Sequence, residues 1–305
     1  MLIRCLAPLL TSYIVNPAAG HGRAGARWRA AYALVSGSGH KILHTERPGH
    51  GRELARRALE NGAKLVVAVG GDGSLGEVVD GFLSVPEKDR TGAAVATFPC
   101  GSGCDFAAHM GIPREPSAWA AAFERGTARR LDAALASFSG RSRHFLNVAA
   151  AGLPGDVALT VARRGKFLGG TLTYLLEGAL AAATSVPRRM RLKLDGKEEE
   201  GDYHLFAAAN TSTFGGGMRL APDADASDGL LDVLTIGGVS RAALLALLPR
   251  AYSGGHLGRP GVTLRKARRV EILSEAGLPL NLDGDAEGET PAVFEALPGV
   301  LPFRL

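Results

Sequence analysis

The stretch KLVVAVGGDGSLGEVVDGF, Lys64 to Phe82, predicts a buried strand, a glycine-rich turn and the start of a helix. Its glycines, Gly71-x-Gly73-x-x-Gly76, fit a dinucleotide-binding pattern, in which backbone amides at a helix N-terminus hold a pyrophosphate. Asp72, however, lies between the first two glycines. A carboxylate beside a pyrophosphate in a cleft of low dielectric costs on the order of several kcal/mol unless a cation lies between them. The turn therefore favours a metal-bound nucleotide such as Mg-ATP over NAD.

A second glycine-rich loop, PCGSGCDFA, follows another predicted strand and contains Gly101, Ser102 and Asp105. Because parallel sheets bind ligands at the carboxyl ends of their strands, we expect Asp72 and Asp105 to lie at the same edge. The sequence contains no GxxxxGK[ST] motif and no H-R-D kinase loop, which excludes P-loop enzymes and protein kinases.

The N-terminal part, about the first 130 residues, alternates strand-like and helical stretches, as in a Rossmann-like α/β domain with a parallel sheet. The strands are expected near Tyr13–Val15, Lys41–Thr45, Leu65–Val69 and Ala93–Phe98, and the helices near Ala26–Leu34, Gly51–Asn61, after Gly73 and near Ser117–Arg125.

The remaining chain contains many short strands and two helical stretches, near Gly170–Thr184 and Arg241–Tyr252, which predicts an antiparallel β-sandwich or barrel. We expect domains at 1–131 and 132–305, with the last residues able to return to the first domain. Since no flexible linker separates them, the domains are expected to abut with a cleft between them.

The composition of the 305 residues, 46% of them hydrophobic, indicates folded domains rather than disorder. The three cysteines, Cys5, Cys100 and Cys104, have no disulfide-framework spacing, which indicates a reducing compartment such as the cytoplasm. Phe167 to Val186 has the length of a membrane span but contains Glu177 and several small polar residues, so an amphipathic helix is expected there.

The net charge of +5 and the pI near 9.3 favour anionic partners such as lipid surfaces or nucleotides. Basic residues concentrate at Arg188–Leu194 and Leu264–Arg269, where a solvated strand face is the alternative interpretation. No aromatic residues alternate with these charges, so we expect no nucleic-acid partner.

Taken together, the motifs resemble the diacylglycerol kinase catalytic family, the lipid kinases that include bacterial diacylglycerol kinase and sphingosine kinases. GGDGS matches the family's Gly-Gly-Asp-Gly-Thr/Ser motif. The resemblance runs from about Tyr13 to Pro298, and the other matching motifs occur in the family's order: NPAAGHG, TERPGHGRELA, PCGSGCDFAAHMGIP, FLNVAAAG, FGGGMRLAPDADASDGLLDV and LDGD. The resemblance implies an N-terminal domain like that of NAD kinase and phosphofructokinase, and a β-sandwich that takes a lipid substrate.

The resemblance also implies the activity: transfer of the γ-phosphate of ATP, with Mg²⁺, to a lipid hydroxyl, most directly from diacylglycerol to phosphatidic acid. A cytoplasmic enzyme in peripheral contact with the inner membrane face is expected. Sphingoid base, phosphatidylglycerol and polyprenol headgroups remain open as acceptors, and the oligomeric state remains open, with a homodimer as one option.

Individual roles come from the resemblance. Asp283 is the expected general base for the lipid hydroxyl, supported by Asp285, and Asp72 is expected to reach Mg²⁺ directly or through water. The residues expected to line the nucleotide are Asn16, Thr45, Gly70, Gly71, Gly73, Ser74, Glu77, Gly101, Ser102 and Asp105. A structural Mg²⁺ is expected at the Asp228 carboxylate and main-chain oxygens near Asp225 and Leu230, because hard cations take oxygen ligands.

Several residues keep plainer interpretations. Asp283-Gly284 is a strong β-hairpin signal, and the acidic run before Leu230 is also typical of a solvated turn. An EF-hand beginning at Asp283 is excluded because its twelfth position is Phe294. The chain departs from the family pattern at Cys104, where Asn is usual, and at Asp285, where Glu is usual.

Two other functions remain open: a soluble phosphotransferase like NAD kinase, and a lipid-binding protein of the same fold without catalysis. An NAD-dependent oxidoreductase is disfavoured by the position of Asp72.

Overall fold

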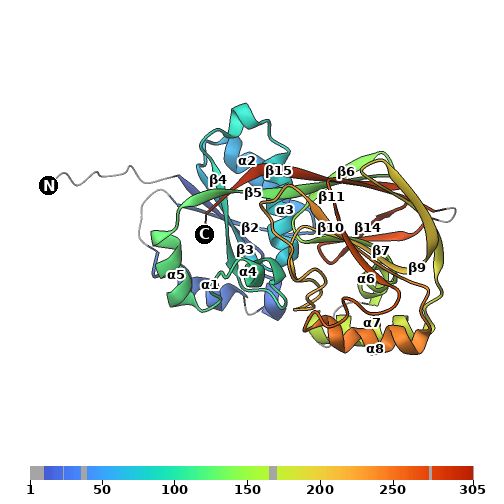
Figure 1. Cartoon of the computed structure of the whole chain (residues 1–305). Helices are drawn as coiled ribbons and strands as arrows, with labels where there is room; N and C mark the ends of the chain where they lie inside the picture. The colour runs from blue at the N-terminus through green and yellow to red at the C-terminus, as the bar shows by residue number, and fades with distance from the viewer. Residues whose placement is uncertain (1–9, 23, 36–39, 165–169, 275–276, 305) are drawn as a thin grey trace. The chain divides into compact units, whose positions relative to one another are not determined.

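The computed structural model describes residues 10–22, 24–35, 40–164, 170–274 and 277–304 (Figure 1). The chain divides into two compact units, one reaching to Arg130 and including the last residues from Leu301, the other running from Leu131 to Val300. Cys5 and the start of the Phe167 stretch lie outside the described residues. The predicted cleft between domains stays a prediction.

The first unit contains a parallel sheet in the order β2-β1-β3-β4-β15, as predicted for a Rossmann-like domain. Its strands are β1 (Thr11–Val15), β2 (Lys41–His44), β3 (Leu65–Gly70), β4 (Ala94–Pro99) and the end of β15 (Ala292–Arg304). Every residue of β3 and β4 is buried, which explains why these strands are apolar runs without alternation.

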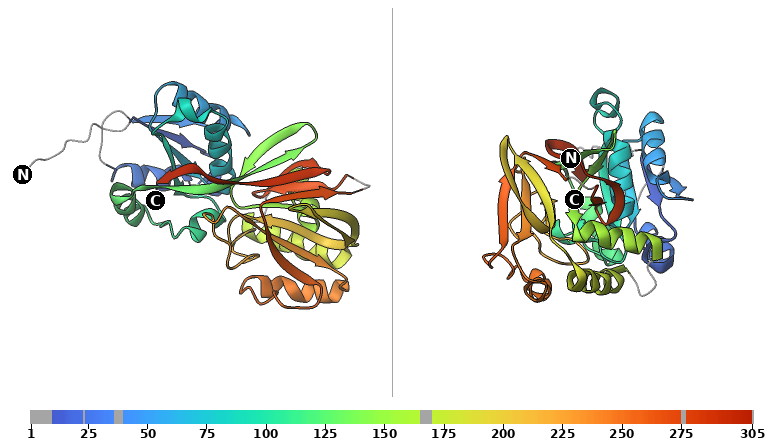
Figure 2. Two further views of the ribbon diagram at one scale, coloured as in Figure 1. Left: turned by 45° about the horizontal axis from the view of Figure 1, so that its top comes forward. Right: turned by 90° about the vertical axis from the view of Figure 1, so that its right-hand side faces the viewer.

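Helices cover this sheet (Figure 2). They are α1 (Ala24–Tyr32), α2 (His50–Glu60), α3 (Asp72–Leu83), α4 (Asp105–His109) and α5 (Pro116–Arg125), with 3-10 turns η1 (Ala19–Gly22) and η2 (Glu87–Arg90). On one face, Trp28 of α1 and Trp119 of α5 pack with Val67 of β3 and Phe98 of β4. Val66 points to the opposite face and is also fully buried, so both faces of the sheet are covered.

The second unit is built on antiparallel strands, as predicted. The strands are β5 (Ala128–Phe138), β6 (Arg141–Phe145), β7 (Val148–Gly152), β8 (Arg188–Leu194), β9 (Lys197–Ala209), β10 (Leu231–Gly237), β11 (Val262–Ala267), β12 (Arg269–Leu273), β13 (Pro279–Leu282), β14 (Asp285–Glu289) and most of β15. Strand β9 pairs with β7, β8 and β10, and it therefore organises this unit.

The central strands are buried on both faces. Phe206 of β9 packs with Phe294 of β15 in a core that contains no helical residue among those that the structure describes. The neighbouring Ala207 faces the other way, into a core that includes Leu244 and Leu247 of α8 (Arg241–Ala251). The sandwich thus carries a helical layer on one face, to which α6 (Leu153–Arg164) and α7 (Gly170–Thr184) also belong.

Helix α6 is the longest helix that was not predicted from the sequence. It begins directly after Gly152, and its opening Leu-Pro-Gly has no polar capping residue and is typical of a loop. The helical signal is the spacing of Leu153, Val157 and Val161, all buried in one core. Gly155 is required there because a Cβ would lie 2.7 Å from the carbonyl carbon of Pro279.

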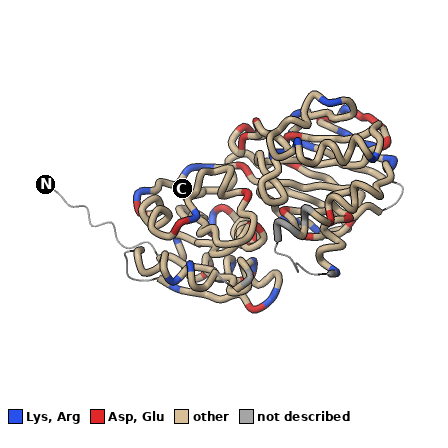
Figure 3. The backbone as a smooth tube through the Cα atoms, turned by 90° about the horizontal axis from the view of Figure 1, so that it is seen from below, with Lys and Arg blue, Asp and Glu red and all other residues tan. Residues whose placement is uncertain are grey.

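The basic strands of the second unit are largely neutralised by neighbouring acidic residues, as the mixed colours in Figure 3 show. Arg189 of β8 pairs with Glu200 at 3.0 Å and with Asp202 at 3.6 Å, and Arg269 of β12 pairs with Glu295 at 3.1 Å. Such exposed pairs contribute about 0–1 kcal/mol each to the free energy of unfolding, so their main effect is to offset the positive charge of these strands. These charges therefore give less reason to expect an anionic partner than the sequence alone did.

Three loops of the first unit meet at the carboxyl edge of its sheet through backbone contacts. The amide of Cys100 donates to the carbonyl of Gly70 at 2.8 Å, and a Cβ at Gly20 would lie 2.5 Å from the carbonyl oxygen of Cys100. A Cβ at Gly101 would overlap the Cα of Gly71 and lie 2.9 Å from its nitrogen. Glycine therefore allows the two predicted phosphate loops to touch.

We predict that Gly101→Ala lowers the free energy of unfolding by about 1–3 kcal/mol, because the methyl group has no space against rigid backbone. Chemical denaturation of the purified protein measures this loss. Gly25→Ala is the control, since its Cβ would meet only the Arg29 guanidinium at 3.8 Å. Equal stability of the two variants would contradict the close approach of the loops.

Candidate functional site

Asp72 is the first residue of α3 and is partly buried. Its carboxylate accepts hydrogen bonds from the backbone amides of Asp105 at 2.9 Å and Phe106 at 3.1 Å. These amides open α4, so Asp72 satisfies donors that have no partner within that helix. Asp72 therefore does not lie in an exposed turn, because its carboxylate bridges two glycine-rich loops. Each of its oxygens keeps a lone pair, and a role toward Mg²⁺ stays a prediction.

Asn16 joins the end of β1 to α3. Its amide nitrogen donates to the Ser74 hydroxyl at 3.0 Å, and its side-chain oxygen accepts from the backbone of Ala18 at 3.0 Å. Gly70 makes room for this contact, since a Cβ there would lie 2.5 Å from the Ser74 Cβ. The structure thus brings Asn16, Gly70 and Ser74 together.

Glu77 serves a neighbouring helix. Its carboxylate accepts from the amides of Gly49 at 2.7 Å and Gly51 at 2.8 Å, where α2 begins. It fixes the loop that follows β2, in which the Thr45 amide donates to the carbonyl of Val15 at 2.9 Å. This geometry makes Glu77 a support of the loop, and its contact with nucleotide stays a prediction.

Two arginines that the sequence analysis missed lie beside the second loop. Arg114 donates to the carbonyl of Gly101 at 2.6 Å and to that of Gly103 at 3.4 Å, and Arg27 of α1 donates to the carbonyl of Arg114. Ser102 is exposed in this loop.

Cys104 precedes α4 with φ of 59°, a left-handed conformation that Asn adopts more readily than other residues. The Asn that is usual in the family at this position would suit the left-handed backbone as well as provide a side-chain hydrogen bond. Burial raises the pKa of the Cys104 thiol to about 11, so it stays neutral beside Asp72.

Asp283 occupies the turn between β13 and β14 with φ of 52°, so the hairpin interpretation is correct for the backbone. Its carboxylate is buried and accepts from the amides of Leu146 at 2.8 Å, Asn147 at 2.7 Å and Val148 at 3.0 Å. Burial raises the pKa of Asp283 to about 6, against the opposing effects of these amides and of Arg143. With this pKa the Asp283 carboxylate is ionised at neutral pH and becomes protonated at a mildly acidic pH at which activity can be measured.

Asp285 lies on the other side of the turn, partly exposed, with its carboxylate 3.3 Å from the Arg143 guanidinium. Arg143 also pairs with Glu287, and these acidic groups raise its pKa despite its burial. Asp285 therefore balances a buried cation, and a catalytic part for it stays a prediction.

A polar cluster that the sequence analysis did not single out surrounds the Asp283 turn. The side chain of Asn147 accepts from the Thr211 hydroxyl at 3.0 Å, and Asn210 donates to the carbonyl of Leu146 at 2.8 Å. Within the described chain, the Asn210 side-chain oxygen is buried and has no hydrogen-bond partner. The motifs FLNV and AAANTS, 64 positions apart, could be connected only by the fold.

The predicted second-unit metal ligands already have protein partners. Asp228 accepts from the Leu230 amide at 3.0 Å and lies 2.5 Å from the Lys266 ammonium, while the Asp225 side chain accepts from the Ser227 hydroxyl at 2.6 Å. Among the described residues, no group of three or more His, Cys, Asp and Glu side chains is arranged to hold a metal. The predicted site also uses main-chain oxygens, and the magnesium site stays a prediction.

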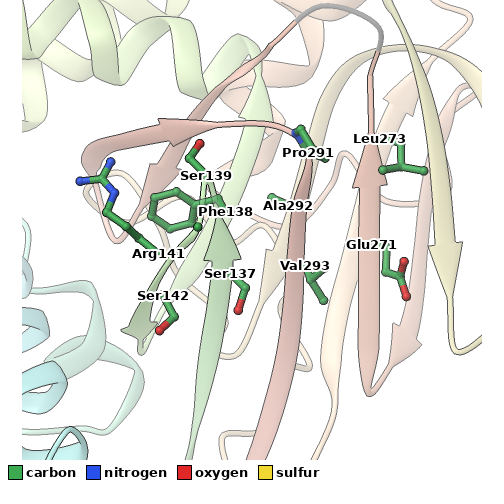
Figure 4. A pocket seen from close by; sticks show the side chains of 11 residues that line it. Ser137, Phe138, Ser139, Arg141, Ser142, Glu271, Leu273, Pro291, Ala292 and Val293 are labelled. Atoms are coloured by element: carbon green, nitrogen blue, oxygen red, sulfur yellow. The ribbon is translucent and has the colours of Figure 1, made fainter.

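An open groove of about 520 Å³ lies elsewhere in the second unit, on β5, β12 and β15 (Figure 4). It is lined by Ser137, Phe138, Ser139, Gly140, Arg141, Ser142, Glu271, Leu273, Pro291, Ala292 and Val293. None of the predicted site residues lines it.

The geometry defines an α/β unit with phosphate-type loops at the edge of a parallel sheet, and a β-rich unit with a buried carboxylate in a hairpin turn. Two family models match these parts: the diacylglycerol kinase catalytic domain over residues 11–136, and the YegS C-terminal NAD kinase beta sandwich-like domain over residues 147–304.

Individual proteins that resemble this chain in sequence or structure agree with the family models. The chain is 30% identical over 247 residues to the diacylglycerol kinase of Bacillus subtilis (81% of this chain, 79% of that protein), and 28% identical over 250 residues to that of Staphylococcus carnosus (82% and 79%). It superposes on a crystal structure of a diacylglycerol kinase from Bacillus anthracis with a TM-score of 0.71 at 20% identity, covering 97% of this chain and 96% of the other. The chain belongs to the diacylglycerol kinase family and is a lipid kinase.

We predict that Asp72→Asn lowers the free energy of unfolding by about 1–3 kcal/mol, because an amide donor would replace an acceptor that faces a backbone N–H. Denaturant titration measures the change, with Asp89→Asn as the control at an exposed position of the same unit. A variant as stable as the control would show that the carboxylate does not hold α4.

Proposed function

We propose that this lipid kinase transfers the γ-phosphate of Mg-ATP to the hydroxyl of a membrane lipid, with diacylglycerol as acceptor and phosphatidic acid as product. The observation that carries the proposal is the meeting of the NPAAGHG, GGDGS and PCGSGC loops in backbone contact at one edge of a parallel sheet. Such an edge is where α/β folds hold nucleotides.

The first unit supplies charge and positioning, which phosphoryl transfer needs more than covalent chemistry. The first turn of α3 leaves backbone N–H groups without intrahelical partners, and such groups bind phosphate. Arg27 and Arg114 add positive charge beside the second loop. Asp72 would hold Mg²⁺ through its remaining lone pairs, and the ion would neutralise charge on the phosphate oxygens.

The second unit supplies the proton acceptor. Asp283 accepts one amide bond on one oxygen and two on the other, so the first oxygen keeps a lone pair for a hydroxyl proton. Three backbone amides fix the carboxylate in place, which is the arrangement that a positioned general base requires. Its pKa of about 6 leaves it ionised, and therefore competent, at neutral pH.

We predict an acid limb in the pH dependence of kcat/KM for phosphatidate formation, with activity falling about tenfold per pH unit below pH 6. Protonation of Asp283 removes the acceptor for the hydroxyl proton.

The stability of the fold has the opposite pH dependence. The folded-state pKa of Asp283 lies above its unfolded value, so Asp283 stabilises the fold most at low pH, and that contribution is lost as pH rises through about 6. Acid inactivation is therefore not expected to follow from unfolding driven by Asp283.

The matched variants are Asp283→Asn and Asp285→Asn. The first should lose at least about 100-fold in kcat, with a nucleotide Kd close to that of the wild type, and the second should lose less. Rates on mixed micelles and calorimetry with nucleotide make the measurement. Wild-type activity that is flat from pH 7 to 5, or an Asp283→Asn variant that retains kcat, would remove Asp283 from the mechanism.

We also propose peripheral membrane contact through α7. Leu176 and Leu180 lie one turn apart on this helix and are 46% and 60% exposed, and Val186 just beyond it is 61% exposed. The Arg241 side chain donates to the carbonyl of Ser185 at 2.9 Å, which places a cation beside this apolar surface. Apolar side chains flanked by a cation fit an anionic lipid surface. Among the described helices, none has both the length and the apolar character to cross a membrane.

We predict that Leu180→Glu lowers partitioning onto phosphatidylglycerol vesicles roughly tenfold in a sedimentation assay, because it removes an apolar group from the lipid contact. Leu273→Glu, at a leucine 44% exposed on β12, should bind like the wild type. If both variants partition like the wild type, α7 does not contact the bilayer.

A soluble phosphotransferase is the second candidate, since the second family model describes a domain like that of NAD kinase. A lipid-binding protein without catalysis does not agree with membership of a lipid kinase family, and the cytoplasmic location stays a prediction. The acceptor that becomes phosphorylated distinguishes these candidates.

A further inference from the structure

A lysine of β11 lies against the acidic loop before β10. Antiparallel pairing of β10 with β11 places Lys266 directly opposite Asp232. The Lys266 ammonium lies 2.5 Å from the Asp228 carboxylate and 3.5 Å from that of Asp232, whose residue is 4% exposed. The Lys266 ammonium thus contacts the carboxylates of both Asp228 and Asp232.

Two further oxygens of the loop also accept hydrogen bonds from protein donors. The carbonyl of Asp225 accepts from the Asp228 amide at 3.3 Å, and the second Asp228 oxygen accepts from the Leu230 amide at 3.0 Å. Asp132 is buried beside the loop, and its carboxylate accepts a hydrogen bond from the amide of Gly229 at 2.6 Å. The backbone is therefore held without a ligand.

The charges act in the same direction. The Lys266 ammonium brings one positive charge into contact with two carboxylates. Asp223, the remaining acidic neighbour that acts on Asp232, is exposed and therefore screened by solvent.

We propose that Lys266 supplies the cation of this loop, so that the second unit folds without a divalent metal at the position where the sequence predicts magnesium. A metal placed on Asp228 would have to displace the ammonium from its carboxylate or lie beside a like charge. The inference concerns the fold of this unit and is independent of the nucleotide chemistry proposed above.

The test is thermal unfolding without nucleotide, in MgCl₂ and in KCl of equal ionic strength. We expect the wild-type Tm to be the same in both salts. Lys266→Met should melt several degrees lower in KCl and regain part of the loss in MgCl₂, because the vacated carboxylates then bind the ion. Lys266→Arg should behave like the wild type, and Lys197→Met, at an exposed lysine on β9, is the matched control.

Two results would overturn the proposal. One is a saturable Mg²⁺ shift of the wild-type Tm that Asp228→Asn abolishes and Asp72→Asn retains, which would place a metal in this loop. The other is a Lys266→Met variant that melts like Lys197→Met in both salts. Should Lys266→Met fail to fold, refolding of Lys266→Arg without divalent ions distinguishes a need for charge from a need for metal.

Discussion

The hydrogen bonds from the amides of Asp105 and Phe106 to the Asp72 carboxylate are the interaction on which the glycine-rich loops of the first unit depend. They join the loop after β3 to the loop after β4, while Gly71 and Gly101 bring the two backbones into contact. The carboxylate that raised the question of a metal thus has a structural role first. The two roles are compatible, because an amide uses one lone pair of each oxygen and leaves the other.

The same device recurs in both units. Glu77 holds the start of α2, Asp132 holds the loop before β10, and Asp283 holds the backbone between β6 and β7. Each is an acidic side chain that binds backbone amides of a segment far away in the sequence. Such charge-assisted hydrogen bonds fix irregular loops that neither helix nor sheet would hold. A kinase that must position phosphate and hydroxyl needs its loops held in this way.

The sequence predicted those features whose cause is local. Strands β3 and β4 are apolar runs, each followed by a glycine-rich loop, and Asp283-Gly284 is a turn signal, so these elements could be identified by inspection. The partners of the carboxylates could not, since Asp72 meets residues 33 and 34 positions away and Asp283 meets residues more than 130 positions away. Helix α6 was missed because Leu-Pro-Gly conceals its start, and Lys266 because only the pairing of β10 with β11 places it opposite Asp232. The assignment of Asp283 as a base came from the family resemblance, and the structure adds a buried carboxylate with a raised pKa.

The central claim is that phosphate passes from ATP to a lipid hydroxyl. Radiolabelled γ-phosphate, offered with diacylglycerol, sphingosine, phosphatidylglycerol, a polyprenol and NAD in parallel reactions, tests it most directly when products are separated by thin-layer chromatography. The account predicts label in phosphatidic acid, dependent on Mg²⁺ and absent with Asp283→Asn. Label in a phosphorylated NAD, or no labelled acceptor from a folded protein that binds ATP, would contradict it.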